Sequence, residues 1–236
     1  MTTVNGQPRI LVVEDDAAVR NLIVTALDSY GYARVVAITG REAIARAATD
    51  NPDLVLLDLG LPDIDGVEVV RSIRGWSQMP IIVVSARAED ADKIDALDAG
   101  ADDYVTKPFS PSELVARVDA VYRRVALATD KGESGVRDEL VSGEFSLNLR
   151  NRSFLKGSRP IDLTQVEFQI MEYFFSHPGV ALNRGDILKH VWGPSYVGEE
   201  KIVDVNIRRL RMKVEDEPSS PKHIVTVWGL GYRWDV

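Results

Sequence analysis

The chain of 236 residues is long enough for two domains that each bury a core, and 45% of its residues are hydrophobic. It contains no cysteine, which excludes disulfides and zinc-thiolate sites, and its three histidines are too scattered to predict a metal site. The net charge of -8 belongs mostly to the first half, because residues 1–128 contain 13 Lys/Arg and 20 Asp/Glu whereas residues 140–236 contain 13 and 12.

Short apolar runs alternate with helical patterns through the first half of the chain. We expect strands at 9–13, 35–38, 54–57, 80–86 and 103–108, and each is followed by a helical pattern that begins near residue 17, 39, 67, 90 or 110. Parallel strands that alternate with helices in this way form one sheet with helices on both faces. The first half is therefore predicted to be an α/β domain with a five-stranded parallel sheet of the flavodoxin-like type.

Polar residues stand at the ends of these strands, and the carboxyl ends of parallel strands meet at one edge of the sheet. The residues that this edge should gather are Glu14, Asp15, Asp58, Ser85 and Lys107. Asp58 follows the buried run 54–57 directly, so it is a candidate site residue, although on that stretch alone it could also be a helix N-cap. Clustered carboxylates repel one another unless a cation intervenes, and hard oxygen ligands favour Mg²⁺. Such a set suits transfer of a phosphoryl group to Asp58. Asp16 is better explained as an acid at the start of a helix.

This half of the chain resembles the receiver domain of two-component response regulators in Glu14-Asp15, Asp58 with Pro62 and Gly66, Ser85-Ala86 and Lys107-Pro108-Phe109. The resemblance implies that Asp58 accepts a phosphoryl group from a sensor histidine kinase. It also implies that Asp15, Asp58 and the backbone carbonyl of Gly60 bind Mg²⁺, with Glu14 acting through water. Lys107 would pair with the phosphoryl group, and the Lys107-Pro108 bond would be cis.

The same resemblance implies a switch and a dimer. The Ser85 hydroxyl would move toward the phosphoryl group and leave room for Tyr104 to turn inward. This would shift the surface formed by the fourth helix, fifth strand and fifth helix between two conformations. Charges on helices usually mean only solvation. Six residues here nevertheless match by position the dimer salt bridges of the OmpR/PhoB-type regulators: Lys93 with Glu113, Asp103 with Arg117, and Asp102 with Arg124. We therefore expect a homodimer when the protein is phosphorylated.

The second half begins after a polar segment with two glycines, so we divide the chain into a receiver domain at 1–126, a linker at 127–139 and a second domain at 140–236. Short strands are expected at 144–149 and 153–155, and capped helices at 164–175 and 183–192. The stretch 199–214 predicts a third helix with one apolar stripe, and 225–234 predicts a β-hairpin. This order, with a basic third helix, predicts an α+β winged helix-turn-helix domain.

The stretches 203–211 and 229–233 resemble the DNA-binding domain of the OmpR/PhoB family. This implies that the domain binds double-stranded promoter DNA and that RNA polymerase is a partner. The candidate residues for contact with DNA are Lys201, Val205, Asn206, Arg208, Arg209 and Arg211. Several family members carry an arginine just before the first glycine of the wing, where this chain has Trp228, so a minor-groove contact by the wing is in doubt.

The stretches 59–63, 85–87 and 92–104 are also similar to the regulators of Kdp potassium-uptake operons. Regulators of phosphate or envelope-stress genes remain alternatives. A hydrolase of the haloacid dehalogenase kind also uses Asp, Mg²⁺ and Lys, but that family has a second acid two residues after its nucleophile, where this chain has Gly60. We therefore expect a regulator and not an enzyme. No apolar run approaches the roughly 20 residues of a membrane span, and the polar residues 1–9 do not suggest a signal peptide, so we expect a cytoplasmic protein without a membrane partner.

Overall fold

The structure is a computed structural model that describes residues 8–130, 139–194, 196 and 200–236, with the backbone alone for 123–130. The chain divides into two compact units, Met1–Tyr122 and Arg123–Val236. Among the described residues, no helix is long and apolar enough to cross a membrane.

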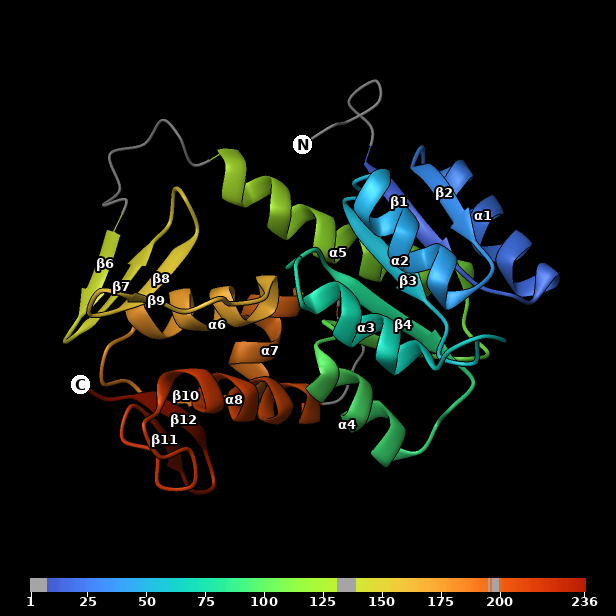
Figure 1. Cartoon of the computed structure of the whole chain (residues 1–236). Helices are drawn as coiled ribbons and strands as arrows, with labels where there is room; N and C mark the ends of the chain where they lie inside the picture. The colour runs from blue at the N-terminus through green and yellow to red at the C-terminus, as the bar shows by residue number, and fades with distance from the viewer. Residues whose placement is uncertain (1–7, 131–138, 195, 197–199) are drawn as a thin grey trace. The chain divides into compact units, whose positions relative to one another are not determined.

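The first unit consists of strands and helices that alternate along the chain (Figure 1). Its strands are β1 (Arg9–Val13), β2 (Ala33–Ala37), β3 (Leu54–Leu57), β4 (Ile81–Ser85) and β5 (Asp103–Thr106). Its helices are α1 (Ala17–Ser29), α2 (Gly40–Thr49), α3 (Gly66–Arg74), α4 (Asp90–Ala99) and α5 (Pro111–Asp130). All strand pairs are parallel, in the order β2-β1-β3-β4-β5 of a flavodoxin-like sheet. The predicted α/β fold is therefore confirmed.

The sheet is covered on both faces, which explains why its middle strand β3 carries an apolar residue at every position. Leu54 and Leu56 of β3 belong to a hydrophobic cluster that includes Ile23 of α1 and Val118 of α5. The alternate residues of β3 point to the opposite face, where α2, α3 and α4 lie side by side (Figure 1). Because helices cover both faces of the sheet, polar side chains gather at the ends of its strands.

Helix α5 continues to Asp130, so the backbone of 127–130 is helical within the segment predicted as a linker. Residues 131–138 of that segment lie outside the described residues. The domain boundaries 1–126 and 140–236 therefore stay a prediction.

After α5, the described part of the second unit combines three helices with two antiparallel sheets. Its helices are α6 (Gln165–Ser176), α7 (Arg184–Trp192) and α8 (Lys201–Val214). One sheet contains β6 (Glu139–Ser142), β7 (Phe145–Asn148), β8 (Ser153–Lys156) and β9 (Arg159–Pro160), and the other pairs β10 (Leu182–Asn183) and β11 (Ile224–Val227) with β12 (Gly231–Trp234). The hairpin β11-β12 is the wing, so the predicted winged helix-turn-helix is confirmed. The sequence did not predict β6, β9 and β10.

An aromatic cluster joins the first sheet of this unit to the wing. The Phe145 ring centroid lies 5.8 Å from that of Phe154 and 5.1 Å from that of Trp234, and Phe175 of α6 also lies 5.1 Å from Trp234. The Trp234 indole donates a hydrogen bond to the Ser142 hydroxyl at 2.8 Å. The strand β6 thus satisfies the one polar atom of a buried tryptophan.

Candidate functional site

Three acids from neighbouring strands form a cluster at the carboxyl edge of the parallel sheet. Val13 on β1 lies opposite Leu57 on β3, so the residues that follow both strands emerge side by side. Carboxylate oxygens of Glu14, Asp15 and Asp58 all lie within 4.8 Å of one another. Glu14 and Asp58 are buried, whereas Asp15 is exposed. The predicted acidic edge is therefore present.

Lys107, from the loop after β5, lies between two of these acids. Its ammonium is 2.7 Å from Oε2 of Glu14 and 2.8 Å from Oδ2 of Asp58. Burial raises the pKa of Glu14, and the hydrogen bond from Lys107 opposes that rise. Burial alone would lower the pKa of Lys107, but the hydrogen bonds to Asp58 and Glu14 outweigh it and raise that pKa. The Lys107-Pro108 peptide bond is cis, as expected.

The acidic cluster fits a divalent cation by the chemistry of its donors. It offers carboxylate oxygens from three residues, which would suit Mg²⁺, and Asp15 is exposed, so water could supply further oxygen ligands. The Gly60 amide lies 3.3 Å from Oδ1 of Asp58, which keeps the loop after β3 beside the carboxylate. The same loop requires a glycine at position 66, because a Cβ there would lie 2.5 Å from the Asp58 carbonyl oxygen.

Ser85 and Tyr104 lie on the adjacent strands β4 and β5. Ser85 ends β4, is buried, and its hydroxyl lies 3.4 Å from the Arg87 amide. The Tyr104 hydroxyl donates a hydrogen bond to the Arg87 carbonyl oxygen at 2.6 Å. Burial raises the pKa of Tyr104, and a hydrogen bond with Ser85 opposes that rise. The two predicted switch residues are thus connected through the β4–α4 loop.

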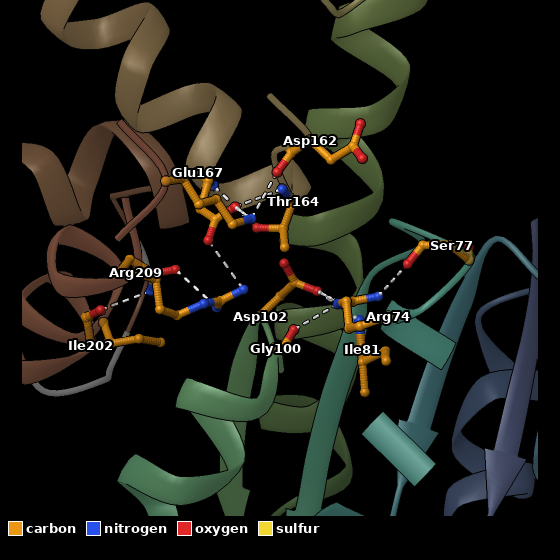
Figure 2. A network of polar contacts seen from close by, with 12 residues as sticks. Arg74, Ser77, Ile81, Gly100, Asp102, Asp162, Thr164, Glu167, Ile202 and Arg209 are labelled. Carbon is orange, nitrogen blue, oxygen red and sulfur yellow. Dashed lines mark hydrogen bonds and ion pairs between the residues drawn. The ribbon is translucent and has the colours of Figure 1, made fainter. Parts of the chain in front are cut away.

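Charged residues of α3, β5 and α5 are joined by ion pairs within the first unit. Arg117 Nη1 lies 3.1 Å from Oδ2 of Asp103, and its Nη2 lies 3.1 Å from Oε1 of Glu113. Asp102 accepts from Arg74 at 2.7 Å and from the Ile81 amide at 2.9 Å (Figure 2). The sequence did not predict the pairing of Arg74 with Asp102, because the two residues are 28 positions apart in the chain. Of the remaining predicted dimer residues, Lys93 lies on α4, and the Arg124 side chain lies outside the described residues.

The third helix of the second unit, α8, presents two exposed cations, Lys201 and Arg208. Arg209 pairs instead with Glu167, whose carboxylate also accepts from Lys213 at 2.6 Å and from the Thr164 amide that it caps (Figure 2). Val205 and Asn206 are buried, and the Asn206 amide donates to the Ile202 carbonyl at 2.8 Å. The helical spacing correctly placed the cations on α8 but did not predict the ion pair of Arg209 or the burial of Val205 and Asn206.

Arg211 ties α8 to the wing. Its guanidinium donates to the Ile224 carbonyl at 2.9 and 2.6 Å and to the Thr226 hydroxyl at 2.8 Å, and it lies 5.5 Å from the Tyr232 ring centroid. On the opposite strand Tyr232 donates to Asp204 at 2.6 Å, and Arg184 approaches both residues. These contacts favour a structural role for Arg211 over the predicted contact with DNA. At the wing tip, Trp228 is 92% exposed.

Two family models match the chain: residues 10–119 match the response regulator receiver domain, and residues 158–234 match the C-terminal domain of transcriptional regulatory proteins. The transcriptional regulatory protein KdpE of Mycobacterium tuberculosis is 40% identical over 226 residues, which cover 96% of this chain and 98% of the relative. The chain belongs to the OmpR/PhoB-type response regulators. It is a phosphorylation-controlled transcription factor with a receiver domain and a DNA-binding domain.

Further relatives agree with this assignment. The response regulator is 40% identical to the KDP operon transcriptional regulatory protein KdpE of Escherichia coli over 95% of this chain and 98% of the relative. It is 39% identical to the sensory transduction protein RegX3 of Mycolicibacterium smegmatis, over 95% and 97%. A solved RitR mutant gives a TM-score of 0.79 over 97% of this chain and 99% of that one, and at 24% identity it supports the fold alone.

Membership of this family decides between the classes that the sequence left open. The relatives of this response regulator are transcriptional regulators and not enzymes, so the alternative of a haloacid dehalogenase hydrolase is excluded. Receiver domains bind Mg²⁺ at an acidic pocket, which agrees with the cluster found here, and the two domains support a histidine kinase and DNA as partners.

Proposed function

We propose that Asp58 is the phosphoacceptor of this response regulator and that a sensor histidine kinase is the donor. One observation carries the proposal: the Asp58 carboxylate shares the edge of the sheet with Glu14 and Asp15 and lies 2.8 Å from Lys107. In the transfer, an Asp58 oxygen forms a bond to phosphorus, the bond from phosphorus to the histidine nitrogen of the kinase breaks, and that nitrogen keeps the electron pair.

The side chains around Asp58 would share the charge of the resulting acyl phosphate. Lys107 already donates a hydrogen bond to Asp58, so its ammonium lies close enough to form an ion pair with the new phosphoryl oxygens. The Ser85 hydroxyl would donate from β4. Glu14, Asp15, Asp58 and the Gly60 carbonyl would hold Mg²⁺, which neutralises charge on the transferred oxygens when it is bound.

Covalent labelling tests the assignment of Asp58. Wild-type chain with acetyl phosphate and Mg²⁺ should gain one phosphoryl group by intact mass, and peptide mapping should place it on Asp58, whereas Asp58→Asn should gain none. Asp16→Asn is the matched control, because Asp16 caps α1 through the Ala18 and Val19 amides and asparagine caps equally well. A label that persists in Asp58→Asn would overturn the proposal.

Phosphorylation would then pair two copies of the chain through α4, β5 and α5. The pairs proposed across the dimer are Lys93 with Glu113, Asp103 with Arg117, and Asp102 with Arg124. Support comes from Arg117, which contacts the carboxylates of Asp103 and Glu113 within one chain. In a dimer the same guanidinium could instead pair with the Asp103 carboxylate of the other copy. The phosphorylated wild type should sediment as a dimer at tens of micromolar, and phosphorylated Arg117→Ala should form less dimer at the same concentration. A phosphorylated wild type that stays monomeric would contradict dimerisation.

Two α8 helices brought together in this way would contact neighbouring promoter half-sites. Lys201 and Arg208 are the strongest candidates because they are exposed, with Arg209 second because its side chain is only 10% exposed. Val205 and Asn206 are buried, which argues against the contacts with DNA that the sequence predicted for them. A dimer bound at tandem sites in a promoter would also lie close to RNA polymerase, which we propose as a further partner.

The target promoter is proposed from the relatives. The similarity to two proteins named KdpE, one of them a KDP operon regulator, supports an operon for potassium transport. Footprinting on a kdp promoter fragment should show protection that strengthens after phosphorylation, and equal protection of unrelated promoters would refute the assignment.

A further inference from the structure

Arg20, on the first turn of α1, holds the backbone of the acidic loop that follows β1. Its Nη1 donates to the carbonyl oxygen of Glu14 at 3.0 Å and to that of Asp15 at 2.9 Å. These two carbonyls belong to the peptide units on either side of the Asp15 Cα. Because each peptide unit is planar, fixing both of them restrains the two backbone dihedrals of Asp15 and therefore the direction of its side chain.

Asp15 depends on this restraint more than the other two acids of the cluster do. The carboxylates of Glu14 and Asp58 both accept hydrogen bonds from Lys107. Asp15 is exposed, and among the described residues the contact that fixes it is the one between its backbone and Arg20. Arg20 is therefore the residue that sets the direction of the third carboxylate.

We propose that Arg20 is a positioning residue that makes the acidic cluster selective for Mg²⁺ over Ca²⁺. Mg²⁺ requires its oxygen ligands in a nearly ideal octahedron, whereas Ca²⁺ accepts more oxygens in flexible geometries. A carboxylate held in one direction favours the smaller ion, and a carboxylate that is free to turn removes that advantage. The proposal rests on the Mg²⁺ site of the proposed function and adds the residue that determines which divalent ion the site prefers.

Arg20 can serve as a fixed point because its own backbone is held at the start of α1. Its amide donates to the Asp16 carbonyl at 2.9 Å, and Asp16 caps the helix by accepting from the Ala18 and Val19 amides at 2.8 and 2.9 Å. On the other side of the loop, the Glu14 amide donates to the carbonyl of the last residue of β2 at 3.1 Å. The loop is thus held at both ends, and Arg20 restrains the residue between them.

The positive charge of Arg20 affects cation binding in the opposite direction from its hydrogen bonds. A guanidinium beside the cluster repels Mg²⁺ and Ca²⁺ alike, so loss of the charge alone would tighten the binding of both ions equally. Loss of the restraint would weaken the binding of Mg²⁺ and change the binding of Ca²⁺ little. The ratio of the two dissociation constants therefore separates the two roles.

The test titrates the unphosphorylated full chain with MgCl₂ and, separately, with CaCl₂ in an isothermal calorimeter. We expect Arg20→Gln to reduce the preference for Mg²⁺ over Ca²⁺ by about three- to tenfold, because it removes a charged donor from two acceptors. Arg20→Lys keeps the charge and a donor, so the preference should fall less than in Arg20→Gln. Because both titrations use one preparation, the ratio does not depend on the fraction of the chain that is folded.

Two controls accompany these variants. The double variant Asp15→Asn, Asp58→Asn gives the background of binding outside the cluster. Arg34, near the amino end of β2, pairs with Asp28 near the end of α1, so Arg34→Gln removes the same charge at the opposite edge of the sheet. It should leave both affinities and their ratio unchanged.

Two results would overturn the inference alone: an unchanged ratio in Arg20→Gln, or an equal fall of the ratio in Arg34→Gln. A wild-type chain that binds Mg²⁺ no more tightly than the double variant would instead overturn the proposed Mg²⁺ site, and this inference with it. Labelling of Asp58 is measured separately, so a chain that binds Mg²⁺ but takes no label would lose the proposed function and keep this inference.

Discussion

The contacts of Arg211 lead to a prediction that separates the arginines of α8 by role. Arg211 donates to two acceptors on the wing and lies over the Tyr232 ring, whereas Arg208 is exposed on the same helix. Substitution of each by alanine should therefore change different properties. Arg211→Ala should lower the stability of the second unit, and Arg208→Ala should weaken its attraction to DNA.

The magnitude follows from the kind of contact that is lost. Hydrogen bonds from a charged donor contribute roughly 1.5 to 3 kcal/mol, and Arg211 makes several to partly buried acceptors. Burial lowers the pKa of Arg211, so part of that gain is offset by the cost of desolvation. We expect Arg211→Ala to cost about 2 kcal/mol in the free energy of unfolding, and Arg208→Ala less than about 0.5 kcal/mol.

Fluorescence can monitor the second unit selectively. Trp192 and Trp234 are buried there, whereas Trp76 and Trp228 are exposed, so a background with Trp76→Phe and Trp228→Phe leaves only the two buried reporters. Urea unfolding in this background gives the stability of each variant. Anisotropy of a labelled promoter duplex at several salt concentrations gives the salt dependence of binding, whose slope should fall by about 0.9 in Arg208→Ala and stay unchanged in Arg211→Ala.

The opposite pattern would refute the reasoning. If Arg211→Ala unfolds at the wild-type urea concentration and also lowers the salt slope by about one, its guanidinium contacts phosphate and the contacts to the wing do not hold it.

Three further predictions concern other parts of the chain. Gly66→Ala should cost about 1 to 3 kcal/mol in stability and slow the labelling of Asp58, because its Cβ would lie 2.5 Å from a backbone oxygen; wild-type labelling would count against this. Burial raises the pKa of Tyr232 from 10.0 to about 12, so its contribution to stability is complete below pH 10.0 and is lost as the pH rises through about 12; an absorbance titration against Tyr232→Phe measures this, and an ordinary pKa would contradict it. Trp228→Arg, at the exposed tip of the wing, should tighten binding to DNA and steepen the salt slope by about one; an unchanged slope would contradict a contact between the wing tip and the duplex.

The sequence predicted those parts of the site that depend on the ends of strands. Glu14, Asp15, Asp58 and Lys107 each follow a strand with a clear pattern, and parallel strands bring their carboxyl ends together whatever the details of packing. The same local signals predicted the helix caps, including Thr164 with its reciprocal partner Glu167.

Contacts between loops had no such signal. The pairing of Asp65 with Arg87 joins residues 22 apart in two loops without periodicity, so nothing in their neighbours' spacing indicated it. Helical spacing placed Arg211 on α8 but could not show where a long, flexible side chain ends. The strands β9 and β10 contain two residues each, and their pairing partners, not their own composition, define them.

The central claim is that a phosphoryl group on Asp58 controls the binding of DNA by α8. The most direct measurement is the affinity of one protein sample for a promoter duplex before and after treatment with acetyl phosphate and Mg²⁺, for the wild type and for Asp58→Asn. We predict that treatment tightens binding by the wild type and leaves Asp58→Asn unchanged. Equal tightening in both proteins, or none in a wild type that is fully labelled, would contradict the claim.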